Sequence, residues 1–359
     1  MSKVLVGLSG GVDSAVAAYL LKEEGYEVIG VMLRTWEAEN GEDSRCCEIE
    51  DAGDVARTLG IPFHAVNCVS EFEKSVVKPF MEDYINGRTP NPCVICNRKV
   101  KFDRMLYLSE VLGADHIATG HYAKVIRLEN GRYTVKKALH AEKDQTYMLC
   151  RLSQDQLSRI LMPLGDLSKE EVRTIAKKAG LSVADKPDSQ EICFILDDDY
   201  AGFIKRNAGR ALPGEGNFVD EEGRVLGRHK GLINYTVGQR RGLGIALGYH
   251  AYVRELRLKE NEILLCPESG IYSQSLICRE ANFLKIPELK KGESLPCFVK
   301  VRYRHRGVRA VIESCAEEGK SIKVTFEEPV KGACPGQTAV FYDEDDCVIA
   351  GAFIDEVIY

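Results

Sequence analysis

The stretch Lys3-Val4-Leu5-Val6-Gly7-Leu8-Ser9-Gly10-Gly11-Val12-Asp13-Ser14 joins an apolar strand pattern to a helical pattern through a glycine-rich turn. It predicts a buried strand at Val4–Leu8 and a helix at Ser14–Glu24 that ends before Gly25. Adjacent glycines let backbone N–H groups approach an anion, and the helix N-terminus adds donors and the positive end of its dipole. The pattern therefore predicts a phosphate-binding loop formed by Gly7, Leu8, Ser9, Gly10, Gly11, Val12, Asp13 and Ser14.

This loop matches neither of the two commonest nucleotide motifs. It lacks the Gly-Lys-Ser/Thr of a Walker loop and the GxGxxG of a dinucleotide fold. The alternative is a plain strand-to-helix turn with a capping Asp or Ser. We favour the phosphate loop, because doubly wound sheets bind nucleotides after the first strand.

Outward from the loop, strand and helix patterns alternate across the first 200 residues. Further strands are predicted at Glu27–Leu33, Phe63–Asn67 and Asp115–Thr119, and further helices at Ile49–Leu59 and around Arg104–Leu112. This alternation is typical of an α/β domain with a Rossmann-like parallel sheet and helices on both faces. Ligands bind such sheets beyond the carboxyl ends of the strands.

The pattern changes after about Tyr200, where glycines and short β-type runs dominate as far as Tyr272. The remaining strands are predicted at Cys297–Tyr303, Val308–Glu313, Ser321–Phe326, Thr338–Tyr342 and Val348–Ile354. This second pattern is typical of a small all-β sandwich or barrel. We expect three domains: an α/β domain with the phosphate loop at 1–200, a central β-rich domain at 201–273 and a C-terminal β-barrel at 274–359.

Composition restricts the class of protein. The chain has 359 residues and an odd number of scattered cysteines, 13, so we expect reduced thiols in the cytoplasm rather than a secreted disulfide framework. No apolar run approaches the ~20 residues of a membrane span, and we expect no membrane partner. The net charge of −6 decides nothing about nucleic acid, because a local basic stripe can bind phosphate in an acidic chain.

Two separated segments place cysteines in reactive surroundings. Asn91-Pro92-Cys93-Val94-Ile95-Cys96-Asn97 carries a CxxC spacing beside prolines that predict a non-helical segment, and a run with excess positive charge follows it. Positive charge favours the thiolate, which is the nucleophile. Cys193 lies downstream, in a segment predicted to be a loop entering a strand.

Other roles for the cysteines stay open. Cys93 and Cys96 could join Cys46 and Cys47 in a four-thiolate metal site, or hold an iron–sulfur cluster. Buried packing is the expected role of Cys68, Cys150, Cys266 and Cys278. For Cys96 and Cys193 we favour redox chemistry and expect no resident metal.

The stretch Lys300-Val301-Arg302-Tyr303-Arg304-His305-Arg306 alternates cationic and other residues. As a strand it would project Lys300, Arg302, Arg304 and Arg306 from one face. A charged sheet edge that blocks aggregation is the alternative. We favour phosphate binding, because like charges on one face repel unless a polyanion neutralises them.

The phosphate loop resembles that of the PP-loop ATP pyrophosphatases, which carry Ser-Gly-Gly-Val-Asp-Ser after strand one. The resemblance implies that ATP is split between its α and β phosphates and that AMP activates a carbonyl oxygen. It also implies nucleotide contacts at Leu33, near the end of the second strand, and at Gly120 in Thr119-Gly120-His121-Tyr122. Mg²⁺ is expected with the triphosphate, and Asp13 could ligate it.

Over essentially its whole length, the chain resembles the bacterial tRNA 2-thiouridylase family. The resemblance rests on Asn-Pro-x-x-x-Cys-Asn with Lys-Phe, on Ser-Gln-Glu-Ile-Cys-Phe-Ile, and on Tyr-Thr-Val-Gly-Gln-Arg-Arg-Gly-Leu-Gly from Tyr235. It implies that Cys96 is the catalytic nucleophile, and that Cys193 carries a persulfide and forms a transient disulfide with Cys96. Many family members have Asp where this chain has Cys93, so a carboxylate role there cannot operate here.

The same resemblance implies the partners and the reaction. The C2 oxygen of the wobble uridine in a tRNA anticodon loop would be adenylated and replaced by sulfur, which a persulfide-carrying donor protein supplies. Asn91, Pro92 and Cys93 would border the target base. Contacts with tRNA would come from His121, Lys143, Asp144, Gln145, Arg302, Tyr303 and Gln337. His121 could also be a metal ligand or general base, and a PP-loop amidotransferase or synthetase acting on a small molecule is the alternative function.

Overall fold

The computed structural model describes residues 1–37, 48–188, 192–315 and 320–359. The chain forms two compact units, each built from segments that are distant in sequence. Unit 1 comprises Met1–Val77, Pro92–Asp198 and Asp345–Val348, and unit 2 comprises Lys78–Asn91, Asp199–Glu344 and Ile349–Tyr359. None of the described helices is long and apolar enough to cross a membrane.

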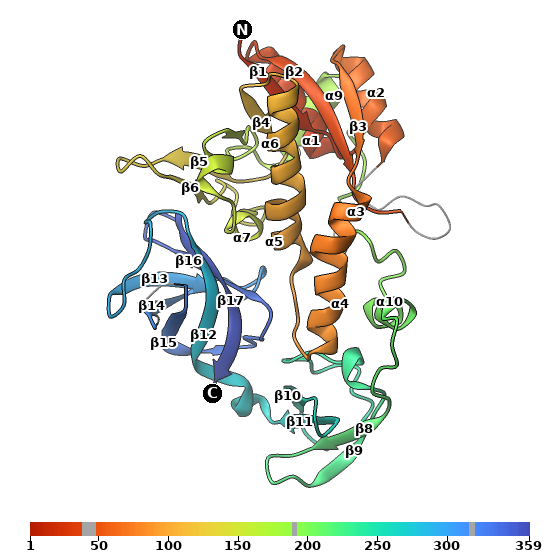
Figure 1. Cartoon of the computed structure of the whole chain (residues 1–359), viewed down its shortest axis with the longest axis vertical. Helices are drawn as coiled ribbons and strands as arrows, with labels where there is room; N and C mark the ends of the chain where they lie inside the picture. The colour runs from red at the N-terminus through yellow and green to blue at the C-terminus, as the bar shows by residue number, and fades with distance from the viewer. Residues whose placement is uncertain (38–47, 189–191, 316–319) are drawn as a thin grey trace. The chain divides into compact units, whose positions relative to one another are not determined.

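A five-stranded parallel sheet is the centre of unit 1, as the alternating pattern predicts (Figure 1). Its order is β3-β2-β1-β4-β7, so the first strand lies in the middle. The strands are β1 (Lys3–Gly7), β2 (Glu27–Arg34), β3 (Phe63–Asn67), β4 (His116–Ala118) and β7 (Ile160–Leu161). Because the strands are parallel, the loops after β1, β2 and β4 leave the sheet at one edge, where the chain turns to opposite sides of β1.

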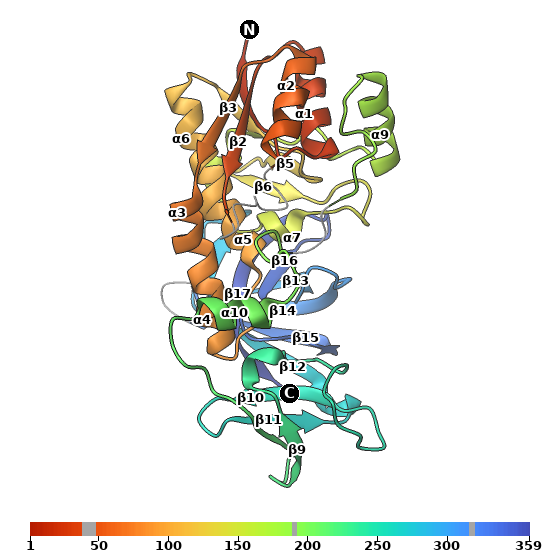
Figure 2. The same ribbon diagram turned by 90° about the vertical axis from the view of Figure 1, so that its right-hand side faces the viewer.

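Helices cover both faces of this sheet (Figure 2). One face packs against α1 (Val12–Glu23), α2 (Ile49–Leu59) and α9 (Lys169–Lys178), whose apolar residues share a core with Val4 and Val6 of β1. The other face meets α6 (Asp103–Val111), where a Cβ added at Gly7 would lie 3.1 Å from Met105 Sδ. Side chains alternate along a strand, so β1 contributes to both layers.

Shorter elements complete unit 1, and several of them are labelled in Figure 1. They are α3 (Val69–Phe72), η1 (Glu73–Val77), α5 (Pro92–Cys96), η2 (Asn97–Phe102), β5 (Lys124–Arg127), β6 (Tyr133–Lys136), α7 (Thr146–Leu149) and α8 (Gln154–Leu157). The non-helical segment expected beside the prolines is wrong, because α5 begins at Pro92. Proline is tolerated in the first turn of a helix, where its missing N–H would have no partner.

Unit 2 contains a four-stranded sheet and a closed barrel, which confirms the β-rich expectation after residue 200. The sheet, ordered β10-β11-β8-β9, is built from β8 (Gly216–Val219), β9 (Val225–His229), β10 (Tyr252–Arg257) and β11 (Glu262–Cys266). The helical elements of unit 2 are α4 (Lys78–Ile85), α10 (Tyr200–Asn207), η3 (Leu232–Asn234) and η4 (Glu268–Ile271). The expected division into three domains stays a prediction.

The barrel closes in the order β12-β15-β14-β13-β16-β17. Its strands are β12 (Tyr272–Phe283), β13 (Ser294–Lys300), β14 (Val308–Ser314), β15 (Ile322–Lys331), β16 (Thr338–Tyr342) and β17 (Val348–Ile358). Closure pairs every edge, and the inward residues form a continuous apolar core that includes Val299, Ile312 and Phe341. The structure therefore selects the barrel over the sandwich.

Candidate active site

The predicted phosphate loop lies between β1 and α1 at the carboxyl edge of the sheet. Gly10 has a φ of 77°, a left-handed conformation that glycine adopts without strain. Gly11 caps α1 without a side-chain hydrogen bond, so no side chain of the cap covers the amides of the first turn. Within the loop, Ser14 Oγ accepts from Ser9 N at 3.1 Å and donates to Gly11 O at 3.0 Å. The loop is thus preorganised for an anion.

Gly120 follows β4 and packs directly on the start of α1. A Cβ added at Gly120 would lie 2.5 Å from the carbonyl carbon of Asp13 and 2.6 Å from Ser14 N. Only glycine fits this approach. Leu33 lies near the end of β2, half-buried and paired with Val66 of β3. The structure therefore brings the loops after β1 and β4 into contact, with Leu33 on the next strand.

A lysine that no sequence pattern singles out bridges two carboxylates beside the loop. Lys169 Nζ, on α9, lies 2.6 Å from Asp13 Oδ1 and 2.6 Å from Asp188 Oδ1, and only 9% of its side chain is exposed. Tyr122 also donates its hydroxyl to Asp13 Oδ1, at 2.7 Å. Burial, and then the Asp13 charge, raise the pKa of Tyr122, so the phenol remains a donor.

Further cations lie beside Asp188 and beside the loop itself. Asp188 pairs with Lys143 at 2.9 Å and with Arg173 at 3.6 Å. Burial opposes ionisation of Asp188, but the hydrogen bonds from Lys143 and Lys169 lower its pKa overall. Lys186 Nζ donates to the carbonyl of Gly10 at 3.2 Å and pairs with Glu48 and Asp51. Four basic side chains therefore gather around a loop that itself presents backbone donors.

Cys96 and Cys93 occupy different environments on one short helix. Cys96 is the last residue of α5 and is 6% exposed, whereas Cys93 is exposed. The next residue, Asn97, is buried and donates its side-chain amide to Met148 O at 3.1 Å. This hydrogen bond fixes the point where α5 passes into η2. The arrangement gives Cys96 a fixed, packed position and leaves Cys93 on the surface.

Cys193 lies in a turn, half-buried. The expected strand after it is wrong: residues 193–198 contain turns, and the next regular element is α10. The turn is held by Phe194, a buried residue. The centroid of its ring lies 6.0 Å from that of Trp36 and 5.6 Å from that of Phe72. Phe72 ends α3, which continues into η1, and η1 packs against α5. Both cysteine segments are therefore supported by the same α3–η1 segment.

The open alternatives for the cysteines have mixed outcomes. Cys46 and Cys47 lie outside the described residues, so the four-thiolate site involving them remains untested. Elsewhere in the described chain, no three His, Cys, Asp or Glu side chains are grouped to hold a metal ion. The prediction of buried packing is confirmed for Cys68, Cys150, Cys266 and Cys278. Burial raises the pKa of Cys150 to about 12, which suits an unreactive thiol.

Some of the residues expected to contact tRNA already make hydrogen bonds within the chain. The buried carboxylate of Asp144 accepts from Thr146 N and Oγ1 and from Ala138 N. Gln145 exchanges hydrogen bonds with the backbone of Tyr122. Burial, and then the Lys101 charge, lower the pKa of His121 to about 3, so its imidazole is neutral. Its Nδ1 lies 2.8 Å from Thr119 Oγ1, and its ring lies 5.9 Å from that of Phe102.

Asn91 and Gln337 belong to unit 2, whereas Pro92 and Cys93 belong to unit 1. Gln337 donates its side-chain amide to the carbonyl of Thr89 at 2.8 Å. Thr89 N in turn donates to Pro335 O at 2.8 Å. Within unit 2, Gln337 therefore positions the segment that leads to Asn91.

The basic stretch is a hairpin connection, so the expected strand with four cations on one face is wrong. β13 ends at Lys300 and β14 begins at Val308, where Val299 pairs with Val308. Residues 301–307 cannot continue the ladder, because the chain reverses in a turn closed by His305 N donating to Arg302 O and by a left-handed residue at position 307. Arg302, Arg304 and Arg306 are nevertheless all exposed.

Comparisons with known proteins agree along the whole chain. Residues 2–197 match the family model "tRNA methyl transferase HUP domain", residues 201–267 its PRC-barrel domain, and residues 273–354 "Aminomethyltransferase beta-barrel domain". A tRNA-specific 2-thiouridylase MnmA from Lachnoclostridium phytofermentans is 49% identical over 99% of this chain and 100% of its own length. The corresponding protein of Clostridium acetobutylicum is 46% identical over 98% and 99%.

Among solved structures, a U34-tRNA thiolase, NcsA, from Methanococcus maripaludis matches 53% of this chain and 60% of its own. Its TM-score is 0.36 at 22% identity, a likeness too weak to carry an argument. The curated relatives, in contrast, align from end to end. The chain belongs to the family of tRNA-specific 2-thiouridylases called MnmA.

Proposed function

We propose that this chain is a tRNA-uridine 2-sulfurtransferase that uses ATP to replace the C2 oxygen of a wobble uridine with sulfur. The observation that carries the proposal is the presence, in one compact unit, of a phosphate loop ringed by cations and of two cysteine segments supported by α3 and η1. The name shared by the full-length relatives supports the same reaction.

The first step is activation of the carbonyl. The C2 oxygen of uracil is a very poor leaving group, because it would have to depart as oxide. Once it is bonded to the α-phosphorus of AMP, it departs as part of a phosphate. The oxygen attacks the α-phosphorus of ATP, and the bond to the β-phosphate bridging oxygen breaks to release pyrophosphate. The backbone donors of Gly10 and Gly11 and the charges of Lys169 and Lys186 stabilise the anions formed.

Mg²⁺ is expected with the triphosphate, and Asp13 could ligate it. Asp13 Oδ1 accepts from Tyr122 and pairs with Lys169. The same carboxylate therefore also anchors the lysine beside the loop. When bound, the metal would screen the charge of the triphosphate.

The second step is delivery of sulfur. Cys193, charged by a persulfide-carrying donor protein, holds the sulfur on its Sγ. In one route that sulfur attacks C2 directly, and the Cys96 thiolate then attacks Cys193 Sγ, which breaks the S–S bond and leaves the sulfur on C2. In the other route the Cys96 thiolate attacks Cys193 Sγ first and releases sulfide, which attacks C2. In both routes AMP departs with the former C2 oxygen. A Cys96–Cys193 disulfide remains, and two electrons from an external thiol must reduce it before the next turnover.

The tRNA contacts are assigned to His121, Lys143, Gln145, Arg302, Tyr303 and Gln337, and Asn91, Pro92 and Cys93 border the target base. Asp144 shapes the segment from inside, because its carboxylate is satisfied within the chain. Neutral His121, whose pKa is lowered by burial, suits contact with a base rather than a phosphate. An enzyme with this substrate works in the cytoplasm.

Mass spectrometry of an unmodified tRNA transcript tests the proposal. The full-length protein is incubated with the transcript, Mg·ATP and a persulfide donor. The expected result is a mass gain equal to the exchange of oxygen for sulfur at one uridine, with stoichiometric AMP and pyrophosphate. Turnover of ATP with ammonia or glutamine and without tRNA would instead establish the amidotransferase, which leaves both cysteine segments without a role.

A further inference from the structure

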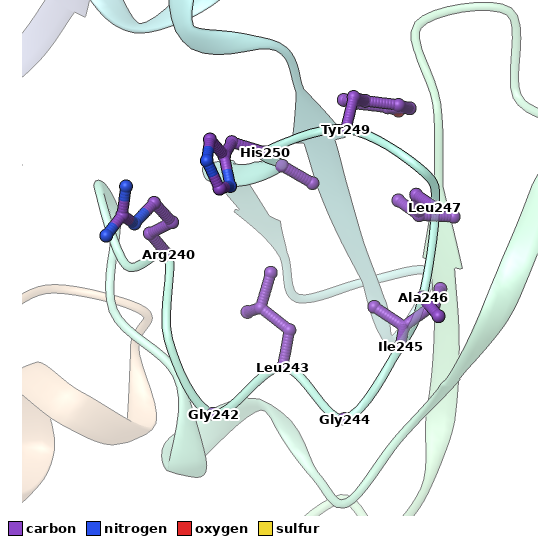
Figure 3. Close-up of a pocket in the computed structure, with 10 residues that line it drawn as sticks. Arg240, Gly242, Leu243, Gly244, Ile245, Ala246, Leu247, Tyr249 and His250 are labelled. Atoms are coloured by element: carbon purple, nitrogen blue, oxygen red, sulfur yellow. The ribbon is translucent and has the colours of Figure 1, made fainter.

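A ring-shaped loop in unit 2 encloses a cavity that the proposed reaction does not use. The loop spans residues 238–251, between η3 and β10, and we call it the arginine loop. Its cavity has a volume of about 500 Å³. Figure 3 shows Arg240 and His250 flanking one end of the loop and Leu243 pointing into it. A space of this size is sufficient for a nucleotide-sized group.

The apolar residues of the arginine loop pack against the hydrophobic core of the four-stranded sheet. Leu243 is buried, and Ile245 and Leu247 pack against the same core. Residues 242, 244 and 248 are glycines with φ values of 74°, 70° and 75°. At its base, Gly238 N donates to Val253 O and Val253 N donates to Gln239 O. Leu243, Ile245 and Leu247 therefore line the cavity and also join the core, while the exposed Arg240, Tyr249 and His250 lie on the rim.

The rim is cationic and carries no acid of its own. Residues 223–254 contain six Lys and Arg and no Asp or Glu. Three of these arginines pair with acids outside the stretch: Arg224 with Asp220, Arg228 with Glu215, and Arg254 with Glu221. Arg240 and Arg241 are both exposed and have no ion pair with any residue that the structure describes.

Glu268, an acid whose charge interacts with Arg240, does not neutralise these arginines. Glu268 is bound by Lys331, whose hydrogen bond is the main cause that lowers the pKa of Glu268, with smaller effects from Arg240 and His250. The single carboxylate of Glu268 thus interacts with Lys331, Arg240 and His250. The excess of positive charge therefore stays on the rim. Such an excess is stable beside a polyanion.

The arginine loop is continuous with the basic hairpin connection of the barrel. A Cβ added at Gly238 would lie 3.7 Å from Gly332 Cα, and one added at Gly332 would lie 3.4 Å from Arg302 Nη1. The hairpin lies in a second acid-free stretch, residues 294–312, which contains five Lys and Arg. Two acid-free segments from separate parts of the sequence therefore meet at Gly332.

We propose that Arg240 and Arg241 bind phosphates of the tRNA backbone and form, with Arg302, one continuous phosphate-binding track in unit 2. This inference rests on the proposed function, because it takes tRNA as the substrate. RNA is favoured over an acidic protein, since Tyr249 presents a half-exposed ring on the same rim, and a nucleobase can stack on such a ring. The track holds the backbone and leaves base selection to unit 1.

The test compares the double variant Arg240→Ala/Arg241→Ala with Arg228→Ala in the full-length protein. Arg228 is an exposed arginine of the same acid-free stretch, but it is paired with Glu215. Affinity for the unmodified transcript is measured from low to high salt. Each lost phosphate contact lowers the slope of log affinity against log salt by about 0.7 to 0.9. By the same rule the double variant should lose about 1.4 to 1.8 in slope, and Arg228→Ala should keep the wild-type slope.

Activity assays separate this inference from the proposed function. The double variant should raise the KM for tRNA much more than it lowers kcat for pyrophosphate release. If the wild type thiolates tRNA but the double variant keeps its slope and affinity, the track is refuted while the proposed function stands. If the double variant binds tRNA normally and loses activity only with a protein persulfide donor, and not with free sulfide, the loop binds that donor instead. If the wild type does not thiolate tRNA at all, the proposed function itself fails.

Discussion

Replacing Lys169 with Met removes the cation that joins Asp13 to Asp188. This change tests whether Lys169 stabilises the phosphate site and the pyrophosphate that leaves it. The lysine makes two 2.6 Å contacts with carboxylates and is 9% exposed, while Asp13 and Asp188 are 31% and 25% exposed. Breaking a fully buried pair costs about 3–5 kcal/mol. Here the carboxylates keep partial solvent, and Tyr122, Lys143 and Arg173 remain as partners. We therefore expect a loss of about 2 kcal/mol, or roughly 4–8 °C in Tm.

The effect on catalysis should be larger than the effect on stability. Without Lys169, the phosphate loop faces the uncompensated charge of Asp13, and the pyrophosphate that leaves loses a positive neighbour. Removing one such stabilising group typically costs about 10²-fold or more in kcat. Pyrophosphate release in the presence of saturating tRNA is the assay. The affinity for tRNA should change less than the rate, because Arg302, Tyr303 and Gln337, which are also assigned to tRNA, are in unit 2.

Lys177→Met is the matched control. Lys177 lies on the same helix and pairs with Asp185 at 2.8 Å, but 59% and 81% of these side chains are exposed. An exposed pair contributes about 0–1 kcal/mol, so this variant should keep its Tm and its pyrophosphate release. Equal behaviour of the two variants would refute the assignment of Lys169 to the phosphate site.

Three further predictions concern other parts of the site. Cys96→Ser and Cys193→Ser should each abolish thiolation with an unchanged Tm, whereas Cys93→Ser should retain substantial activity; an inactive Cys93→Ser that has also lost bound zinc or iron would favour the metal site. Arg302→Ala and Arg304→Ala should each reduce the salt slope of tRNA binding by about 0.7 to 1, and wild-type slopes would show that the hairpin does not contact phosphate. The pKa of His121, about 3 in the native state against 6.5 in the unfolded chain, means that the native state binds fewer protons, so stability falls as the pH drops from about 6.5 towards 3. Urea midpoints at pH 7 and pH 5 should therefore differ less in His121→Gln than in the wild type, and equal pH dependence would contradict the assignment.

The sheet can be predicted from the sequence because its signals are local. The helix at Ile49–Leu59 and the strand at Phe63–Asn67 have the same bounds in the structure as in the sequence pattern, since a glycine follows the helix and an apolar run defines the strand. Two of the errors lie where proline or arginine changes the local rule. Pro92 begins a helix instead of excluding one, and the alternating stretch after Lys300 bends into a turn although its exposure alternates.

The site can be predicted only in part, because half of it is made by tertiary contacts. The phosphate loop has a local signature in its glycines, whereas Lys169 and Asp188 converge on Asp13 from far downstream in the chain. The only local signal at Lys169 is the capping box of Ser168 and Glu171, which starts α9 but does not say where its lysines point. Likewise, Gly120 is required by its approach to Asp13, and no sequence pattern around it shows that approach.

The two cysteines proposed for sulfur transfer have environments that match the two different tasks. A nucleophile must approach one atom in one geometry, and Cys96 ends a helix whose next residue, Asn97, is buried and hydrogen-bonded. A sulfur carrier must accept its sulfur from a donor and then present it to the substrate, so it needs access from more than one direction. Cys193 is half-buried in a turn that Phe194 anchors by contacts with Trp36 and Phe72. The difference in packing therefore supports assigning the nucleophile to Cys96 and the persulfide to Cys193, rather than the reverse.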